Sequence, residues 1–256
     1  MIDISNVSLT INGAVILDGI SISMNDGETV GVIGRSGSGK TAFLKSIAGL
    51  MRPYRGSVLV NSAPLRREAG GNGKIVSYYG AGVPQNPDET LFDFLLLARV
   101  PYKKYLKPFS DYDRQITEEF MEILGLTPFG DAKIGTLPDG LFRLAMLAHV
   151  FIGEAYAVIL DNPTNDLDIV SVRLLRKALS RYVMNGNRIA IICSNDLNFI
   201  SQTADRVLVM DAGRVAKTGS VDILDAELIK KYFGIDVIIS KNIYNGKPEI
   251  HLFPDT

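Results

Sequence analysis

A loop of small residues between an apolar segment and a helical segment constrains the fold of this chain more than any other feature. Residues 29–33 form a compact apolar run, residues 34–41 read GRSGSGKT, and apolar residues follow at helical spacing from Ala42. The loop matches the pattern G-x-x-x-x-G-K-[ST], in which small residues let successive backbone N–H groups face an anion. The following helix adds the positive end of its dipole. The loop therefore predicts phosphate binding by Gly34, Arg35, Ser36, Gly37, Ser38, Gly39, Lys40 and Thr41.

Three side chains have specific predicted roles at such a site. Lys40 supplies a mobile positive charge for the β- and γ-phosphates of a nucleotide, and the Thr41 hydroxyl is a ligand for Mg²⁺. The stretch VILDNPTNDLD, residues 158–168, reads like a buried strand that ends at Asp161. This carboxylate is predicted to hold Mg²⁺ directly or through water. The alternative interpretations are a chance Gly/Ser loop and an aspartate in a turn or helix cap. Because the loop and the aspartate occur in the same chain, a nucleotide site is favoured.

The pattern of apolar residues predicts the fold class. Residues 2–11 and 14–24 alternate and are separated by Asn12-Gly13, which indicates an antiparallel sheet. After residue 155 strands and helices alternate, which is typical of βαβ units and a parallel sheet. We expect an α/β P-loop NTPase (RecA-like) core with an N-terminal antiparallel β subdomain and an inserted α-helical subdomain. The expected domains are a nucleotide-binding domain over 1–220, with its helical subdomain at about 85–155, and a C-terminal extension over 221–256, a helix and a hairpin packed on the core.

Composition excludes several classes of protein. The net charge is −1, so no basic surplus indicates nucleic acid binding. A single cysteine, Cys193, cannot form an internal disulfide and favours a reducing compartment. No apolar run approaches the ~18 residues of a membrane span, and the first residues lack the features of a signal peptide. We expect a cytoplasmic protein that touches a membrane only through a partner.

The order of the remaining motifs resembles that of the ATP-binding subunit of an ABC transporter, over essentially the whole chain. Gln85 follows a strand-like segment, LPDGL at 137–141 opens a helix, and NDLD at 165–168 comes soon after Asp161. The resemblance implies that ATP and Mg²⁺ are the cofactors. It also implies that Gln85 is the lid glutamine, which contacts Mg²⁺ or the attacking water, and that Asp168 belongs to the D-loop. The signature motif would be Leu137, Pro138, Asp139, Gly140 and Leu141.

The same resemblance implies partners and a transport direction. Subunits of this family form a head-to-tail dimer on a membrane permease, and each ATP lies between the phosphate loop of one chain and the signature of the other. Residues 95–126 and 227–254 resemble the helical lobe and the C-terminal extension of importer subunits for iron-siderophore, haem and cobalamin. We therefore expect metal-chelate import, a permease partner and a second ATP-binding chain, with the protein held at the inner face of the membrane through the permease.

The chain departs from the family pattern where the chemistry is carried out. Asn162 stands in place of the general-base glutamate, and an amide is far less basic than a carboxylate; loss of a general base commonly removes ~10²–10⁴-fold in rate. Asn195 stands in place of the switch histidine. The alternative interpretation is that it simply caps a helix over 197–204, and both interpretations can hold at once. In the signature, Pro138 lacks the N–H and the hydroxyl of the family serine, and Asp139 places negative charge near a phosphate.

These departures leave several functions open. We expect Mg-ATP binding with slow or absent hydrolysis, and weaker nucleotide affinity because no aromatic residue near Ile11 offers a stacking surface for adenine. The alternatives to a transport motor are a non-hydrolysing ATP-binding regulatory subunit and the degenerate half of a heterodimeric ATPase. A chromosome or repair ATPase is disfavoured because no heptads lie between Lys40 and the signature.

Overall fold

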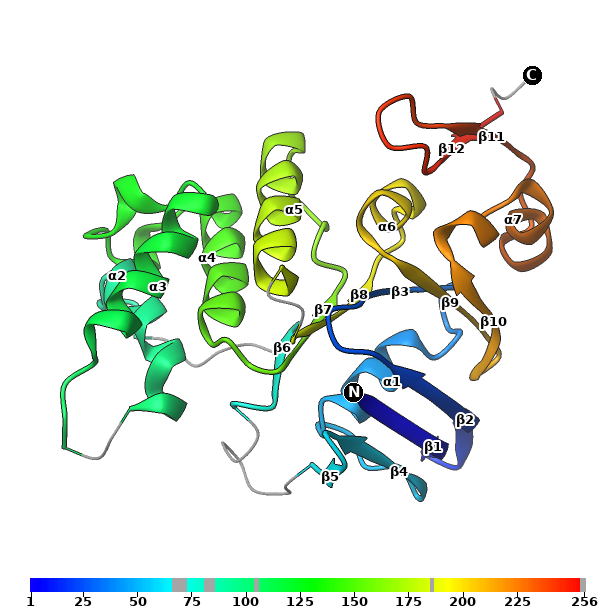
Figure 1. Ribbon diagram of the computed structural model, residues 1–256, viewed down its shortest axis with the longest axis horizontal. Coiled ribbons are helices and arrows are strands. Elements are labelled where there is room, and N and C mark those ends of the chain that lie inside the picture. Colours follow the sequence, from blue (N-terminus) through cyan, green and yellow to red (C-terminus); the bar gives the residue numbers. More distant parts are fainter. Residues whose placement is uncertain (66–72, 81–85, 104–105, 185–186, 254–256) are drawn as a thin grey trace.

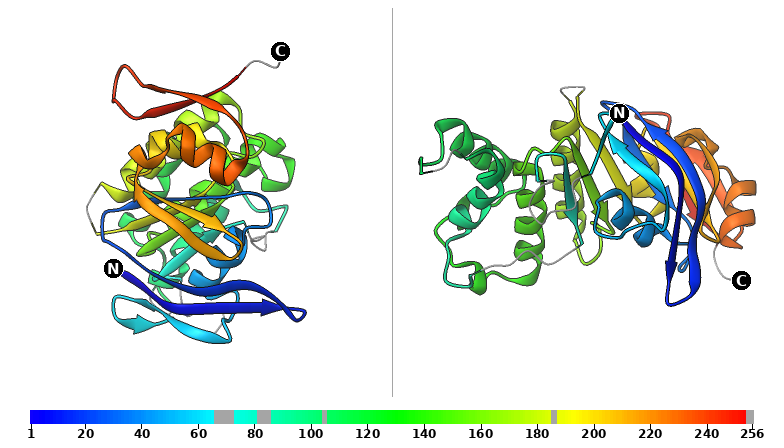
Figure 2. Two further views of the ribbon diagram at one scale, coloured as in Figure 1. Left: turned by 90° about the vertical axis from the view of Figure 1, so that its right-hand side faces the viewer. Right: turned by 90° about the horizontal axis from the view of Figure 1, so that it is seen from below.

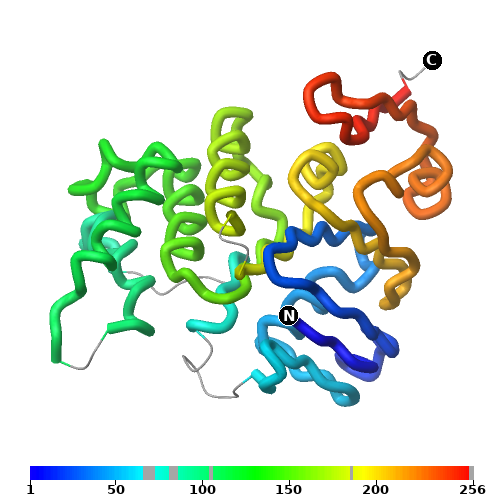
Figure 3. The backbone as a smooth tube through the Cα atoms, viewed as in Figure 1, coloured from blue at the N-terminus to red at the C-terminus, as the bar shows by residue number. Residues whose placement is uncertain are grey.

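The described residues form three β-sheets with helices between and beside them (Figure 1). The structure is a computed structural model that describes residues 1–65, 73–80, 86–103, 106–184 and 187–253. Figure 3 traces the backbone from the N-terminal sheet, through helices at one end of the molecule, to C-terminal segments at the other end. The α/β fold class expected from the sequence is confirmed, whereas the domain boundaries at residues 85, 155 and 220 stay predictions.

The N-terminal sheet is antiparallel, as its alternating pattern predicts. Its strand order is β2-β1-β4-β5. Asn12 and Gly13 form the turn between the first two strands with φ values of 49° and 80°, and Ile11 pairs with Ala14 across it. Positive φ at both turn residues suits the twist of a two-residue hairpin. The strands are β1 (Ile2–Ile11), β2 (Ala14–Met24), β4 (Arg55–Val60) and β5 (Ala63–Pro64).

The central sheet has six strands in the order β10-β9-β3-β8-β7-β6. All neighbours are parallel except the edge hairpin of β9 and β10. Every residue of β3 and β8 is buried, as expected for strands covered on both faces. Because the strands are parallel, their carboxyl ends share one edge. The strands are β3 (Thr29–Ile33), β6 (Val76–Tyr79), β7 (Ala157–Asp161), β8 (Ile189–Cys193), β9 (Arg206–Asp211) and β10 (Arg214–Ser220).

Helices cover both faces of the central sheet and form two apolar cores. Val30 and Val32 pack with α1 and the N-terminal sheet, whereas Ile33 faces the core formed with the helices of the opposite side. Figure 2 shows the N-terminal sheet and the C-terminal hairpin on opposite sides of the central sheet. The helices are α1 (Lys40–Ile47), α2 (Leu91–Leu96), α3 (Asp111–Ile123), α4 (Asp139–Ile152), α5 (Ile169–Val183), α6 (Leu197–Thr203) and α7 (Ala226–Phe233). None of the described helices is both long and apolar enough to cross a bilayer.

Short 3-10 helices complete the connections. They are η1 (Leu97–Tyr102), η2 (Thr127–Phe129), η3 (Ile134–Thr136) and η4 (Val221–Ile223). The predicted C-terminal helix and hairpin are present as α7 and the pair β11 (Val237–Lys241) and β12 (Pro248–Leu252). The hairpin is held on α6, because the Asn198 side chain donates to the Ile250 carbonyl at 2.9 Å and accepts from the Ile250 N–H at 2.7 Å.

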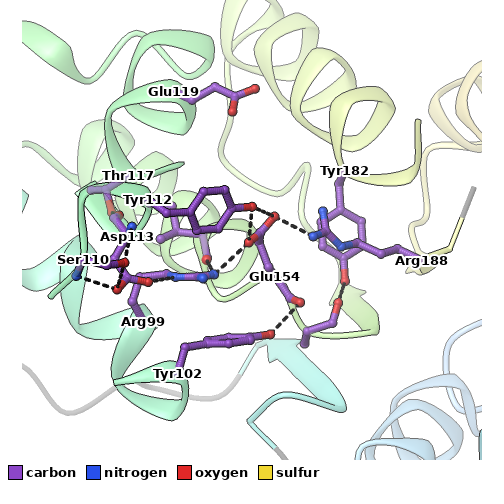
Figure 4. Close-up of polar contacts among 12 residues, drawn as sticks. Arg99, Tyr102, Ser110, Tyr112, Asp113, Thr117, Glu119, Glu154, Tyr182 and Arg188 are labelled. Atoms are coloured by element: carbon purple, nitrogen blue, oxygen red, sulfur yellow. Dashed lines mark hydrogen bonds and ion pairs between the residues drawn. The ribbon is translucent and has the colours of Figure 1, made fainter. Parts of the chain in front are cut away.

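A buried ion network joins the helical region, formed by α2, η1 and α3, to the central sheet (Figure 4). Arg99 Nε donates to Asp113 Oδ1 at 2.8 Å, and Arg99 Nη1 donates to Glu154 Oε2 at 3.0 Å. From the other side, Arg188 Nη2 donates to Glu154 Oε1 at 2.5 Å. The side chains of Arg99, Asp113 and Glu154 are only 3%, 8% and 7% exposed. Buried charges are stable only when paired, so this network fixes η1 and α3 to the turn that precedes β7.

Candidate nucleotide-binding site

Lys40 crosses the interior of the predicted phosphate loop. Its Nζ donates to the Gly34 carbonyl at 2.7 Å and to the Arg35 carbonyl at 2.9 Å, and the residue is only 8% exposed. The helix α1 begins at Lys40, two residues before the start that the sequence pattern indicated, because Gly39 at its N-cap takes a left-handed conformation with φ 97°. The loop thus presents a positive charge and a helix N-terminus to the same space.

Two glycines of the loop are required by close backbone approach. A Cβ atom on Gly34 would lie 2.3 Å from the Met210 carbonyl oxygen and 2.6 Å from Ser38 Oγ, at φ 153°. A Cβ atom on Gly39 would lie 3.0 Å from the Ile16 carbonyl oxygen. The loop is therefore packed against β2 and the end of β9, and side chains at these positions would displace it.

The carboxylate of Asp161 lies at the carboxyl end of β7, between two donors. The Tyr78 hydroxyl donates to Asp161 Oδ2 at 3.0 Å, and Asn162 Nδ2 donates to Asp161 Oδ1 at 3.1 Å. Burial and the neighbouring Asp161 charge raise the pKa of Tyr78, so this hydroxyl stays protonated and remains a donor. Burial likewise raises the pKa of the adjacent Cys193 thiol to about 12. The two donors orient this carboxylate, and the N-cap of each described α-helix is another residue.

Asn162 takes a left-handed backbone conformation beside this carboxylate. Its φ is 51°, and its N–H donates to the Cys193 carbonyl at 2.9 Å. Asparagine adopts this conformation more readily than other non-glycine residues. The backbone at Asn162 thus ties the end of β7 to the end of β8.

The phosphate loop and both unusual asparagines line one cavity. It has a volume of 390 Å³ and is bounded by loop residues, by the apolar side chain of Ile16, and by Asn162 and Asn195. Asn162 also lines a neighbouring cavity of 570 Å³, together with Tyr78, Asp161 and Asp139. The structure therefore brings together the predicted residues Lys40, Thr41, Asp161, Asn162 and Asn195, although they come from three separate segments of the sequence.

The expectation that Asn195 caps a helix is wrong. The N-cap of α6 is Asp196, whose Oδ1 accepts a hydrogen bond from the Phe199 N–H at 2.9 Å. Leu197 is the first helical residue, and Asp196 directly before it has the extended backbone of an N-cap, so Asp196 rather than Asn195 caps the helix. Asn195 lies one position earlier and is exposed in the cavity wall.

The predicted signature forms the exposed start of α4. Pro138 is its N-cap and provides no side-chain hydrogen bond, and Asp139 is the first helical residue. Pro138, Asp139 and Gly140 are exposed, whereas Leu137 and Leu141 are partly buried against the apolar core. An exposed carboxylate therefore stands at a helix N-terminus, the position where a partner phosphate would otherwise be attracted.

The structure describes Asp168 but not Gln85, the other remaining predicted site residue. Asp168 is the N-cap of α5, and its Oδ1 accepts from the Ser171 N–H at 2.7 Å. Gln85 lies outside the described residues. Sequence reasoning missed Tyr78 and the ion pair of Arg143 with Asp166, at 2.8 Å, both of which line the larger cavity. A polar aromatic residue in a buried strand was the available signal for Tyr78.

The cavity residues fit a nucleotide with its metal ion. Among the described residues, the buried atoms Ser38 Oγ and Asn162 Oδ1 have no hydrogen-bond partner. Unpaired buried polar atoms require a ligand or water. The described part of the chain has no cluster of three His, Cys, Asp or Glu side chains that could enclose a metal. Such a donor set suits Mg²⁺, which is usually held by one or two carboxylates together with substrate phosphates.

Comparisons with known proteins identify the family of the chain. A family model described as ABC transporter matches residues 17–165. An uncharacterized ABC transporter ATP-binding protein of Methanocaldococcus jannaschii is 26% identical over 242 residues, 93% of each chain. A hemin import ATP-binding protein of Gloeobacter violaceus is 28% identical over 260 residues, 97% of this chain and 92% of the relative. One chain in a structure reported for a metal-chelate type ABC transporter has a TM-score of 0.79 at 18% identity, covering 98% of this chain and 97% of the other.

The fold and the cavity define a nucleotide-binding cassette with a P-loop. The family model covers more than half of the 256 residues. The chain belongs to the ABC transporter family, as an ATP-binding subunit.

Proposed function

We propose that this chain binds Mg-ATP with little or no turnover and couples that binding to a membrane permease for metal chelates. The metal-chelate class is supported by a relative that is a hemin import ATP-binding protein and by the helical and C-terminal segments that resemble such importers. The observation that carries the proposal is the cavity in which Lys40 and Thr41 face Asn162 and Asn195.

The binding half of the site keeps the groups that hold phosphate and Mg²⁺. Lys40, the backbone N–H groups of the loop and the start of α1 attract phosphate oxygens. Thr41 and Asp161 would hold Mg²⁺, and the ion when bound neutralises charge on the phosphates. Ser38 Oγ, unpaired among the described residues, gives the loop one more donor.

The hydrolytic half lacks the groups that would activate water. The side chain of Asn162 donates its amide to Asp161 and keeps only a weakly basic oxygen, which cannot take a proton from water at neutral pH. Asn195 cannot exchange a proton as an imidazole does. Loss of a general base alone commonly costs ~10²–10⁴-fold in rate, so bound ATP should be hydrolysed slowly or not at all.

Equilibrium binding and phosphate release, measured on the same purified protein, test this proposal. Calorimetric titration with Mg-ATP should give saturable binding, and Lys40→Ala should abolish it. Malachite-green assays should detect phosphate release no faster than in the Lys40→Ala control. Steady multiple turnover by the parent chain would refute the proposal.

A second candidate is that this chain is the degenerate half of a heterodimer. The exposed start of α4 favours it, because Pro138 offers no side-chain donor and Asp139 would place a carboxylate toward a phosphate held by another chain. Two unit charges of like sign ~4 Å apart repel by about 4 kcal/mol at an effective dielectric constant near 20. A homodimer would carry this repulsion at both of its sites.

Light scattering with and without Mg-ATP distinguishes the two assemblies. A heterodimer subunit should stay monomeric alone and should co-purify with a second ATP-binding chain. Asp139→Gly should then increase self-association in Mg-ATP. A parent homodimer that forms only with Mg-ATP would count against the second candidate and leave the first intact.

We propose that the permease contacts the helical region. Three apolar side chains there are exposed, by 41% at Leu97, 51% at Val100 and 87% at Leu106. Val100→Glu should weaken co-purification with a co-expressed permease, whereas Ile243→Glu at the distant C-terminal hairpin should not. Equal loss in both variants, or in neither, would contradict this assignment. The protein would then reach the membrane only through this contact, on its cytoplasmic face.

A further inference from the structure

A second polar cavity lies at the opposite end of the central sheet from the phosphate loop. Its volume is 460 Å³, and its walls come from residues 173–183 of α5, the end of α6 with Asp205 just after it, and the first residue of β3, Thr29. The phosphate loop follows the carboxyl end of β3, whereas Thr29 is its amino end. The two cavities share no lining residue, so a ligand in one would not occupy the other.

Three cations on one helix face line this cavity. On α5, Arg176 and Lys177 follow Arg173 by three and four residues, a spacing that places them on one side of the helix. Within the described ranges, no carboxylate lies within 4.0 Å of any of the three charged groups. Three unpaired positive charges repel one another, and a bound anion would relieve that repulsion.

A fourth cation lies beside the cavity, and one carboxylate lines its wall. Lys247 Nζ donates to the Ala204 carbonyl at 2.9 Å, next to the cavity wall. Burial lowers the pKa of Lys247, and the positive charge of Arg176 acts in the same direction, whereas the carboxylates of Asp205 and Asp222 oppose it. Asp205, the carboxylate in the wall, already accepts from the Thr29 N–H at 2.9 Å. The cavity keeps a positive surplus in a chain whose net charge is −1.

The walls of the cavity are also fixed in place. Arg176 Nη2 donates to the Gln202 carbonyl at 3.3 Å, and Asn245 Nδ2 donates to Gln202 Oε1 at 2.7 Å. These bonds connect α5, α6 and the turn of the C-terminal hairpin. Thr203 lines the same cavity, and its buried Oγ1 has no hydrogen-bond partner among the described residues. Held side chains lose less entropy when they bind a ligand.

We propose that this cavity, the α5–α6 basic cleft, binds a small phosphate compound with two or more negative charges. Its volume lies within the range of about 300–1,000 Å³ typical of small-molecule sites. Arginine pairs with phosphate oxygens through parallel N–H bonds, and Arg173 and Arg176 provide two such groups. Both a phosphorylated metabolite and a second molecule of nucleotide share the required chemistry.

Calorimetric titration with inorganic pyrophosphate tests the proposal. The parent protein is first saturated with ADP, so that the phosphate loop is filled, and no Mg²⁺ is added because it complexes pyrophosphate. Saturable binding at one site per chain is expected. The variant R173Q/R176Q/K177Q should bind pyrophosphate at least ten times more weakly while its affinity for ADP is unchanged. Glutamine keeps helix propensity, and matching thermal unfolding curves should show that the variant is folded.

Lys230→Gln combined with Lys231→Gln, on the exposed face of α7, is the matched control. It removes two positive charges and should leave pyrophosphate binding unchanged. Absence of saturable binding, equal binding by the triple variant, or equal loss in the α7 control would overturn the proposal. Repeating the titration with ATP in place of pyrophosphate distinguishes a second nucleotide from a phosphorylated metabolite. If the ligand is a nucleotide, the parent protein should show a second ATP site that the triple variant lacks. Failure of ADP to bind would instead refute the function proposed for the phosphate loop.

Discussion

Replacing Glu154 by Gln should destabilise the protein more than any surface charge substitution. Glu154 accepts hydrogen bonds from Arg99 at 3.0 Å, Tyr112 at 2.9 Å and Arg188 at 2.5 Å, and its side chain is 7% exposed. Removal of one member of a buried ion pair costs about 3–5 kcal/mol, because the partner charge stays buried. Arg99 would retain Asp113, so we expect the lower end, about 3 kcal/mol.

The corresponding change in melting temperature is measurable. In domains of 150–250 residues, 1 kcal/mol lowers Tm by about 2–4 °C, so Glu154→Gln should lower it by roughly 6–12 °C. Circular dichroism is the suitable probe, because the chain contains no tryptophan. Asp88→Asn, which breaks the ion pair of two exposed side chains with Lys133, is the control and should cost less than about 1 kcal/mol. Equal losses in the two variants would refute the claim that the network fixes the helical region to the sheet.

Three further predictions follow from the same contacts. Burial lowers the pKa of His149 to about 4, below the ~6.5 of the unfolded chain, so the stability that this residue contributes is complete above pH 6.5 and is lost as pH falls toward 4. His149→Leu should reduce the loss of unfolding free energy over this pH range by at most about 3 kcal/mol. Urea unfolding at several pH values measures this, and an unchanged dependence of the unfolding free energy on pH would contradict the prediction. Gly34→Ala should weaken Mg-ATP binding about tenfold or more in calorimetry, because its Cβ would lie 2.3 Å from the Met210 carbonyl oxygen and backbone strain costs ~1–3 kcal/mol; unchanged affinity would show that the loop can shift freely. Asn162→Glu should raise phosphate release by about 10²-fold, the lower bound for a general base, and no increase would place the defect elsewhere.

Local sequence patterns predicted the parts of this protein that depend on neighbouring residues. The hairpin at Asn12-Gly13 and the phosphate loop follow from residue types at fixed spacing, since both need positive φ or small side chains at particular positions. Asp161 was identified because a buried strand ends there. The helix cap before α6 was missed by one residue, because Asn195 and Asp196 are both good caps and only the backbone decides between them.

Contacts between distant segments could not be predicted from such patterns. The Tyr78 hydroxyl meets Asp161 only because β6 pairs with β7 across 83 residues of sequence. Arg99 and Glu154 are 55 residues apart, and neither lies in a motif that indicates pairing. The cations of α5 are visible as a spacing, but their cavity exists only because α6 and β3 close it. These features depend on how distant segments pack against one another in the folded chain, which local sequence patterns do not determine.

The identity of the nucleotide that stays on the protein tests the central claim most directly. The chain should be incubated with excess Mg-ATP, separated from free nucleotide, denatured, and its bound nucleotide quantified by ion-exchange chromatography. The account predicts intact ATP at close to one equivalent per chain, and none on the Lys40→Ala variant. Bound ADP with continuing phosphate release, or no retained nucleotide, would contradict an ATP-binding subunit that has lost its hydrolytic groups at Asn162 and Asn195.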